Sequence, residues 1–132
     1  MSEPIEYLDL DDLLKMARGL LGDPPPVRDL GLLGSAVARP RTSAFGEDAY
    51  PDTWTKAAAL LHSLVNNHPL VDGNKRLGWL ATAVFLELNE ASVSSASNGA
   101  VYDVVITVAT QDLSITDIAR SLRDLADWPA NS

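Results

Sequence analysis

The chain has 132 residues, 46% of them hydrophobic, which predicts one globular domain spanning residues 1–132 with a real core. Its net charge of −8 argues against broad binding to nucleic-acid phosphates or to anionic membranes, and the absence of cysteine excludes disulfides, thiolate metal sites and a cysteine nucleophile. The acidic N-terminus is unlike a signal peptide and no apolar run approaches the ~20 residues of a membrane span, so we expect a cytoplasmic protein without direct nucleic-acid or membrane contacts.

Apolar residues recur with helical spacing through almost the whole chain. The first predicted helix spans residues 10–21, and the acidic residues at its start suit the helix dipole. The run GDPPP ends it, and a shorter helix is predicted over residues 29–37. We interpret ARPRTSAFGEDAYPD, residues 38–52, as a loop or irregular flap, with Pro51 in the first turn of the next helix.

The loop NNHPLVDG connects the third and fourth predicted helices. The third has a stripe running from Trp54 to Val65, and we expect Asn66 and Asn67 to cap its end, because asparagine tolerates left-handed geometry. The fourth, residues 74–89, is apolar nearly all round. A helix without a polar face is typical of a central, buried position.

The C-terminal third contains two further helices. Residues 101–110 are β-branched, which fits a strand, but the spacing of their valines favours a helix capped by Asn98. Ser114 and Asp117 form a capping-box-like pattern that opens the last helix, and Trp128 and Pro129 close it. The sequence therefore predicts an all-α, compact bundle of about six helices around one buried central helix.

The residues that could bind a ligand cluster where the fourth predicted helix begins. Lys75 and Arg76 lie at a helix start, where the dipole disfavours cations. Gly73 before them lets the backbone turn its N–H groups toward a ligand, and the helix start offers more such donors. Together these residues predict an anion site, although each alone also fits a turn glycine or a solvated corner.

Three side chains beside this cradle complete a reaction site. Asp72 offers a carboxylate of the kind that Mg²⁺ takes together with phosphate oxygens, although a helix cap is an alternative role. Asn74 can donate to a phosphate oxygen, and His68 can accept a proton from a hydroxyl. The set predicts transfer of part of a nucleotide onto a hydroxyl group.

The stretch HPLVDGNKR, residues 68–76, resembles the signature of the Fic/Doc family, His-x-Phe-x-Asp-Gly-Asn-x-Arg, at the start of a central helix. Lys75 at the eighth position resembles the Doc branch, whereas Fic adenylyltransferases carry a second glycine there. The family fold is a compact helical bundle, and the likeness covers about residues 8–126.

The resemblance implies a toxin kinase that moves the γ-phosphate of ATP, with Mg²⁺, to a threonine of elongation factor Tu, and that a Phd-like antitoxin inhibits. By motif position, His68 is implied as general base and Asp72 as Mg²⁺ ligand. Gly73, Asn74, Lys75 and Arg76 are implied as the ligands of the nucleotide phosphates.

The sequence departs from the family pattern at two places, Leu70 for the usual phenylalanine and Trp79 where many Fic enzymes have a second arginine. Leu70 is a tolerable replacement for a buried anchor. Lys75 and Trp79 together remove parts of the pocket used for adenylyl transfer, which favours phosphoryl transfer. Fic-type adenylylation, or an inactive Fic-fold module that binds its partner or autoregulates an operon, are the alternatives.

Several residues outside the motif allow two interpretations each. His62 and His68 lie about 120° apart on a helix, so they are poor joint metal ligands, and His62 is expected to be a core or surface residue. Arg39 and Arg41 lie either in a flap that aligns the protein substrate or in a solvated loop. The tryptophans are expected in the core or in groove walls, where they could bind an antitoxin helix: Trp54, Trp79 and Trp128.

Overall fold

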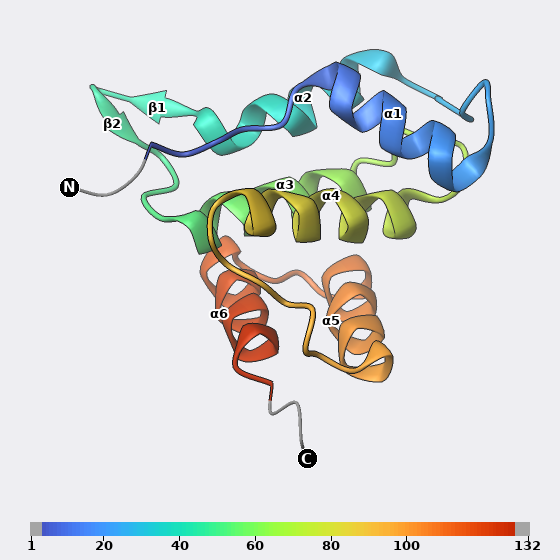
Figure 1. The fold of residues 1–132 in the computed structure, drawn as a ribbon. Helices are drawn as coiled ribbons and strands as arrows, with labels where there is room; N and C mark the ends of the chain where they lie inside the picture. Colours follow the sequence, from blue (N-terminus) through green and yellow to red (C-terminus); the bar gives the residue numbers. More distant parts are fainter. Residues whose placement is uncertain (1–3, 129–132) are drawn as a thin grey trace.

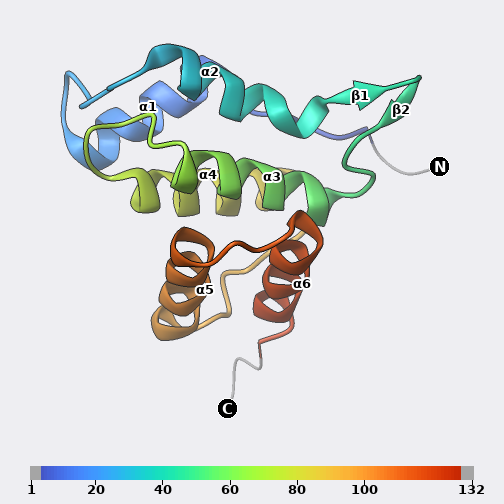
Figure 2. The same ribbon diagram turned by 180° about the vertical axis from the view of Figure 1, so that it is seen from behind.

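The computed structural model describes residues 4–128 and confirms an all-α fold. Three layers of paired helices are stacked: α1 and α2, then α3 and α4, then α5 and α6 (Figures 1 and 2). The elements are α1 (Leu10–Leu21), α2 (Leu30–Ala38), the 3₁₀ helix η1 (Arg39–Arg41), β1 (Ser43–Ala44), β2 (Glu47–Asp48), α3 (Thr53–Asn66), α4 (Asn74–Leu88), α5 (Asn98–Thr110) and α6 (Ile115–Ala126).

The most deeply buried helix is α3 rather than α4. Every residue of α3 from Lys56 to Val65 is buried except His62, because α2, α4, α5 and α6 all pack against it. In α4 the buried positions are Leu77, Gly78, Ala81, Thr82, Phe85 and Leu86, and the apolar residues between them are partly exposed. The expectation that residues 74–89 form the central helix is therefore wrong, since small alanines let α3 approach its neighbours on all sides.

Side-chain caps fix where the helices begin, and they differ from the sequence prediction at three places. Pro51 lies before the helix, since the side chain of Asp52 is the N-cap of α3. Ser97, and not Asn98, caps α5 by accepting the Ala100 N–H at 3.1 Å. Ser114 accepts the Asp117 N–H at 3.1 Å, but no reciprocal bond from Asp117 completes a capping box. Serine and aspartate oxygens thus supply the caps in each case.

The end of α3 also differs from the prediction. Asn67 is the C-cap, but its backbone is right-handed, with φ −91° and ψ −8°. The left-handed residue of this turn is His68, with φ +51°. Asn66 instead links two layers, because its side-chain amide donates to the carbonyl of Val108 in α5 at 3.2 Å.

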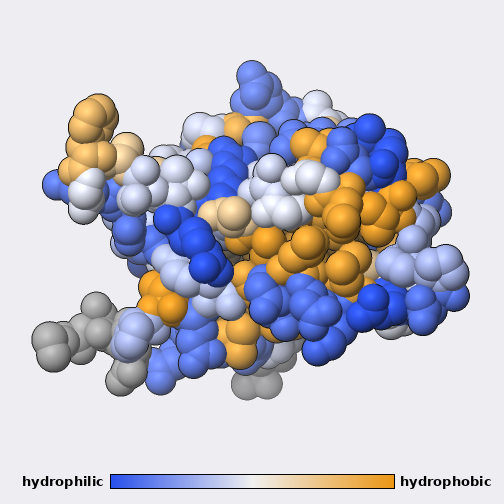
Figure 3. All heavy atoms as spheres, turned by 90° about the horizontal axis from the view of Figure 1, so that it is seen from above, coloured by the Kyte–Doolittle hydropathy of each residue, from blue (hydrophilic) through white to orange (hydrophobic). Residues whose placement is uncertain are grey.

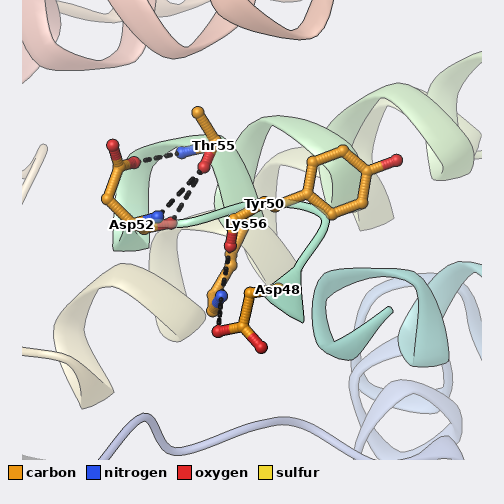
Figure 4. Close-up of polar contacts among 5 residues, drawn as sticks. All are labelled: Asp48, Tyr50, Asp52, Thr55 and Lys56. Carbon is orange, nitrogen blue, oxygen red and sulfur yellow. Dashed lines mark hydrogen bonds and ion pairs between the residues drawn. The ribbon is translucent and has the colours of Figure 1, made fainter. Parts of the chain in front are cut away.

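The flap predicted at residues 38–52 contains η1 and a two-stranded antiparallel hairpin whose tip exposes Phe45 fully, at 105%. A buried lysine fastens the hairpin to α3 (Figure 4). The Nζ of Lys56 donates to the carboxylate of Asp48 at 3.1 Å and to the carbonyl of Tyr50. Because its side chain is only 1% exposed, both partners offset the desolvation of the charge.

The C-terminal predictions are otherwise confirmed as far as the described residues reach. Residues 101–110 are helical, within α5. Trp54 and Trp79 pack against the core, whereas Trp128 is 39% exposed and Pro129 lies outside the described residues. The α1–α2 side carries a band of apolar side chains between polar ones (Figure 3). Within residues 4–128 no helix has the length and apolar character needed to cross a bilayer.

Candidate functional site

The motif turn, residues 67–73, connects the end of α3 to the start of α4 and lies beside the proline-rich segment 24–28. An antiparallel bridge joins Val27 to Leu70. The Val71 N–H donates to the carbonyl of Pro26 at 2.8 Å, and the Arg28 N–H donates to the carbonyl of Pro69 at 2.8 Å. The two segments therefore hold each other as a short two-stranded ribbon.

The side chain of His68 is exposed, on a backbone of unusual shape. Its φ of +51° lies in the left-handed region, where histidine occurs more often than most residues but still at a conformational cost. The Arg28 guanidinium stabilises this geometry, with Nε donating to the carbonyl of His68 at 2.7 Å and NH2 to that of Asn67 at 3.0 Å. The predicted general base thus projects from a backbone that a side chain of another segment holds by hydrogen bonds.

Gly73 precedes α4 in a place that no other residue fits well. Its φ is +88°, and a Cβ at this position would lie 2.6 Å from a methyl group of Leu21 at the end of α1. The backbone conformation favours glycine, and a Cβ at this position would also force the Leu21 side chain to move. The Gly73 N–H donates to the Asp72 carboxylate at 2.9 Å, so in this conformation it faces a carboxylate rather than open solvent.

Asn74 has a role that the sequence analysis did not anticipate. Its side-chain Oδ1 accepts the Leu70 N–H at 2.9 Å and its Nδ2 donates to the Leu70 carbonyl at 3.0 Å. The amide therefore pairs with one backbone residue of the motif turn, as a neighbouring strand would. Leu70 itself is 1% exposed, which confirms the expectation of a buried anchor at that position.

Lys75 and Arg76 are the second and third residues of α4, and both side chains are exposed. The first hydrogen bond of the helix runs from Leu77 to Gly73, so the preceding N–H groups of α4 are oriented to receive an anion. Arg76 also reaches the carbonyl of Leu20 at 3.4 Å, in the last turn of α1. The dipole of α4 disfavours the Arg76 charge at its start, but the dipole of α1 favours the same charge at its C-terminal end.

Asp72 fits the requirements of a magnesium ligand. It is exposed, and its Oδ1 accepts the Gly73 N–H, which leaves the second carboxylate oxygen directed away from that bond. Residues 4–128 contain no group of three or more histidine and carboxylate side chains that could hold a metal. One carboxylate nevertheless suffices for Mg²⁺ when phosphate oxygens and water supply the remaining ligands.

A groove of about 570 Å³ lies between α4 and α5 and begins at the two motif cations. Lys75 and Arg76 line one part of it, and the rest is mainly apolar. Its walls include Leu20, Trp79, Leu80, Ala83, Val101 and Val105. Tyr102 also lines it and is 64% exposed. An apolar groove of this kind, open at a positively charged end, suits an amphipathic segment of another chain.

Arg39 and His62 form a structural cluster away from the motif. Arg39 donates to the Tyr50 hydroxyl at 2.8 Å and to Ser63 Oγ at 3.0 Å, and it lies 2.9 Å from His62 Nδ1. Arg41 stacks on Tyr7, 4.6 Å from the ring centre. The interpretation of a solvated loop arginine is therefore wrong for Arg39, whose guanidinium holds the flap region against α3. Arg41 is exposed, as that interpretation expected, although its guanidinium also contacts Tyr7.

The hairpin and the motif turn lie at opposite ends of α3 (Figures 1 and 2). The hairpin precedes the first residue of this helix and the motif follows the last. Fourteen residues of α-helix span about 21 Å at ~1.5 Å per residue. The flap therefore does not adjoin His68 in this structure.

Comparison with known proteins shows the family of this chain. Residues 7–86 match the model of the Fic/DOC family, and this range contains both the motif turn and the segment that binds it. The chain belongs to the Fic/Doc family. It is also 45% identical, over 122 residues that make up 92% of the chain and 94% of the relative, to Toxin Doc of Mycolicibacterium smegmatis (strain ATCC 700084 / mc(2)155).

Within this Fic/Doc domain, two contributions to the site were missed from sequence. Arg28 follows a proline run that we had interpreted only as a helix terminator, and it lies 40 residues before His68. Leu21 was predicted only as the last residue of the first helix, but it also borders Gly73. Arg28 could have been singled out as the cation next to a rigid Pro-Pro-Pro run, whereas Leu21 has no distinguishing sequence signal.

We predict that Gly73→Ala destabilises the protein by about 1–3 kcal/mol, because the new methyl meets Leu21 and the left-handed backbone disfavours alanine. Urea unfolding would measure this change. Gly99→Ala in α5 is the matched control, since a Cβ there enters open space, and it should be neutral or slightly stabilising. Equal stability of Gly73→Ala and the parent would contradict the argument.

We also predict that stability falls as the pH is lowered through about 6.5, the ordinary pKa of histidine. Burial and the nearby Arg39 guanidinium lower the pKa of His62 in the folded protein, against an opposing effect of Asp112. Below pH 6.5 the unfolded chain therefore binds more protons than the folded one, and the loss levels off below the folded pKa. His62→Gln should flatten this dependence in urea unfolding between pH 5 and 8.

His68→Gln serves as the control for the pH experiment, because it removes the other of the two histidines, which is exposed. It should retain the parent's pH dependence of stability. If His62→Gln retained the dependence and His68→Gln lost it, the assignment to His62 would be wrong.

Proposed function

We propose that this protein is the toxin of a toxin–antitoxin pair and acts as a protein kinase, with the motif turn as its active site. The observation that supports this most strongly is the exposed His68 imidazole, whose backbone is held by Arg28 and which precedes by six residues the start of α4 with its cations Lys75 and Arg76. The 45% identity to Toxin Doc supports the toxin role. By resemblance, the acceptor is a threonine or serine of a translation factor, with elongation factor Tu as the first candidate.

In the proposed reaction His68 accepts the proton of the acceptor hydroxyl as its oxygen attacks the γ-phosphorus of ATP. A new oxygen–phosphorus bond forms, the bond to the β,γ-bridging oxygen breaks, and ADP leaves with its electron pair. The N–H groups at the start of α4 and the cations Lys75 and Arg76 offset the negative charge of the phosphates. Asp72 would hold Mg²⁺, which supplies further neutralisation of phosphate charge when bound.

Phosphoryl transfer is favoured over adenylyl transfer by the side chain at position 75. Lysine occupies the place of the second glycine of Fic adenylyltransferases, and it lies exposed at the start of α4. A bulky cation there obstructs one phosphate subsite, so ATP would bind with its γ-phosphate toward the acceptor. Asn74 takes part indirectly in this proposal, because its amide pairs with Leu70 and shapes the turn that meets the phosphates.

We propose further that the groove between α4 and α5 receives an amphipathic segment of a Phd-like antitoxin. The apolar walls with Trp79, Leu80 and Val105 match the buried face of a short helix, and Lys75 and Arg76 would attract acidic residues at its end. Occupation of this groove would place the antitoxin against the phosphate-binding residues. An inactive binding module remains the alternative from another functional class.

Transfer of label from ATP tests the reaction. We predict that γ-labelled ATP with Mg²⁺ labels elongation factor Tu and that α-labelled ATP does not. His68→Ala should lower the rate by about 100-fold or more, since general-base catalysis alone contributes that much. Asp72→Ala should also lower the rate, because it removes the carboxylate that would hold Mg²⁺. Lys15→Ala, which removes an exposed ion pair on α1, should act like the parent. Label from the α-position would establish adenylylation, and no label with no nucleotide binding would favour the inactive module.

Antitoxin binding tests the groove. We predict that Tyr102→Glu weakens binding of the cognate antitoxin at least about tenfold in calorimetry, because it places a charge on an apolar wall. Phe45→Glu is the matched control, an exposed aromatic residue at the hairpin tip outside the groove. Undiminished affinity of Tyr102→Glu, or equal loss in both variants, would exclude this docking site.

A further inference from the structure

We infer that Arg28 is a positioning residue for the reaction, whose guanidinium holds the backbone of the motif turn so that the His68 imidazole meets the acceptor hydroxyl. This inference deepens the proposed function and rests on it. Arg28 lies in the segment before α2, outside the motif, and its side chain makes hydrogen bonds to the turn that contains the general base.

The bonds that Arg28 makes fit the planar fork of a guanidinium. Nε donates to the carbonyl of His68 at 2.7 Å, and NH2 donates to the carbonyl of Asn67 at 3.0 Å. These carbonyls belong to successive residues, so two parallel N–H groups of one rigid plane fix their relative orientation. A lysine ammonium is a single point of charge on a flexible stem and does not reproduce this geometry.

The residues of the motif turn differ in the groups that hydrogen-bond their backbone, and Arg28 serves the carbonyls of Asn67 and His68. Pro69 accepts the N–H groups of Arg28 and Asp29, at 2.8 and 3.0 Å. Leu70 is paired with the Asn74 amide, and Val71 donates to Pro26. For Asn67 and His68, the Arg28 guanidinium supplies the side-chain hydrogen bonds that reach their carbonyls within residues 4–128.

The left-handed backbone of His68 makes this support important for the side chain. A histidine with φ +51° reaches a different region of space from one with φ in the ordinary negative range, because the Cα–Cβ bond is rotated about the N–Cα axis. Without the guanidinium, the ordinary range becomes more favourable for this residue. A catalytic base displaced by about 1 Å can lose a factor of about 100 in rate.

The exposure of Arg28 indicates that its role is positioning of the turn and not stabilisation of the core. Arg28 and His68 are both exposed, whereas the packing of the turn depends on Leu70 and Pro69, which are buried. Removing the guanidinium therefore leaves the core intact and releases only the two carbonyls. The expected defect lies in the catalytic step and not in the amount of folded protein.

The test compares Arg28→Ala with Arg123→Ala, which removes the same charge from an exposed position on α6. With γ-labelled ATP and elongation factor Tu, Arg28→Ala should lower kcat about tenfold or more and change the KM for ATP less than about threefold. Added guanidinium at tens of millimolar should restore part of the kcat of Arg28→Ala and none of that of His68→Ala. Arg28→Lys should resemble Arg28→Ala.

A nuclear magnetic resonance measurement keeps the inference separate from the proposed reaction. The ring carbon–proton signal of His68 should shift in Arg28→Ala and stay in place in Arg123→Ala. If the parent transfers no label but the signal shifts as described, the proposed function fails and the positioning role of Arg28 stands. An unchanged signal, a kcat within twofold of the parent, or a loss that guanidinium does not restore would overturn the inference.

Discussion

Burial of α3 on all of its sides is the constraint on which the rest of the structure depends. Alanines and leucines let helices from all three layers approach this helix, and the hairpin and the motif turn are attached to its two ends. At the N-terminal end Lys56 holds the hairpin, and at the C-terminal end the chain leaves the core directly into the motif turn. Because α3 is held in place by packing, the hairpin and the motif turn are each anchored where they join this helix.

The motif turn combines the exposed side chain of His68, the proposed general base, with a backbone held by hydrogen bonds. A turn at the surface loses the support of core packing on one side. Here the segment before α2 and the Asn74 amide replace that support with hydrogen bonds to the backbone from Asn67 to Val71. The imidazole remains accessible, and its attachment point remains defined, which is the arrangement that preorganised catalysis requires.

Much of this fold could be predicted from sequence because apolar spacing and capping residues act locally. The approximate bounds of the six helices follow from the apolar period and, for all of them except α4, from a serine or aspartate cap at the helix start. The identity of the central helix was wrong, because apolarity around α4 was interpreted as burial while the smaller side chains of α3 decide which helix is enclosed. A periodic apolar pattern shows which face of a helix is buried, but it does not show which helix its neighbours enclose most closely.

The candidate site residues could be named from the sequence, but the contacts that support them in the structure could not. Each motif residue was identified by its chemistry within nine consecutive positions. Arg28 and Leu21 act from other elements, across 40 and 52 residues, so no local pattern connects them with the motif. The same limit applies to Asn74, whose amide was predicted to bind phosphate and whose hydrogen bonds to the backbone of Leu70 were not predicted.

The placement of the hairpin has a consequence for the size of any acceptor that contacts both ends of the molecule. The hairpin tip and the His68 turn are separated by at least the length of α3, about 21 Å. An extended polypeptide advances about 3.3 Å per residue, so roughly six residues of acceptor chain would be needed to cover that span. A short peptide around the modified hydroxyl would reach the imidazole alone, whereas a folded acceptor with a long exposed loop would reach both.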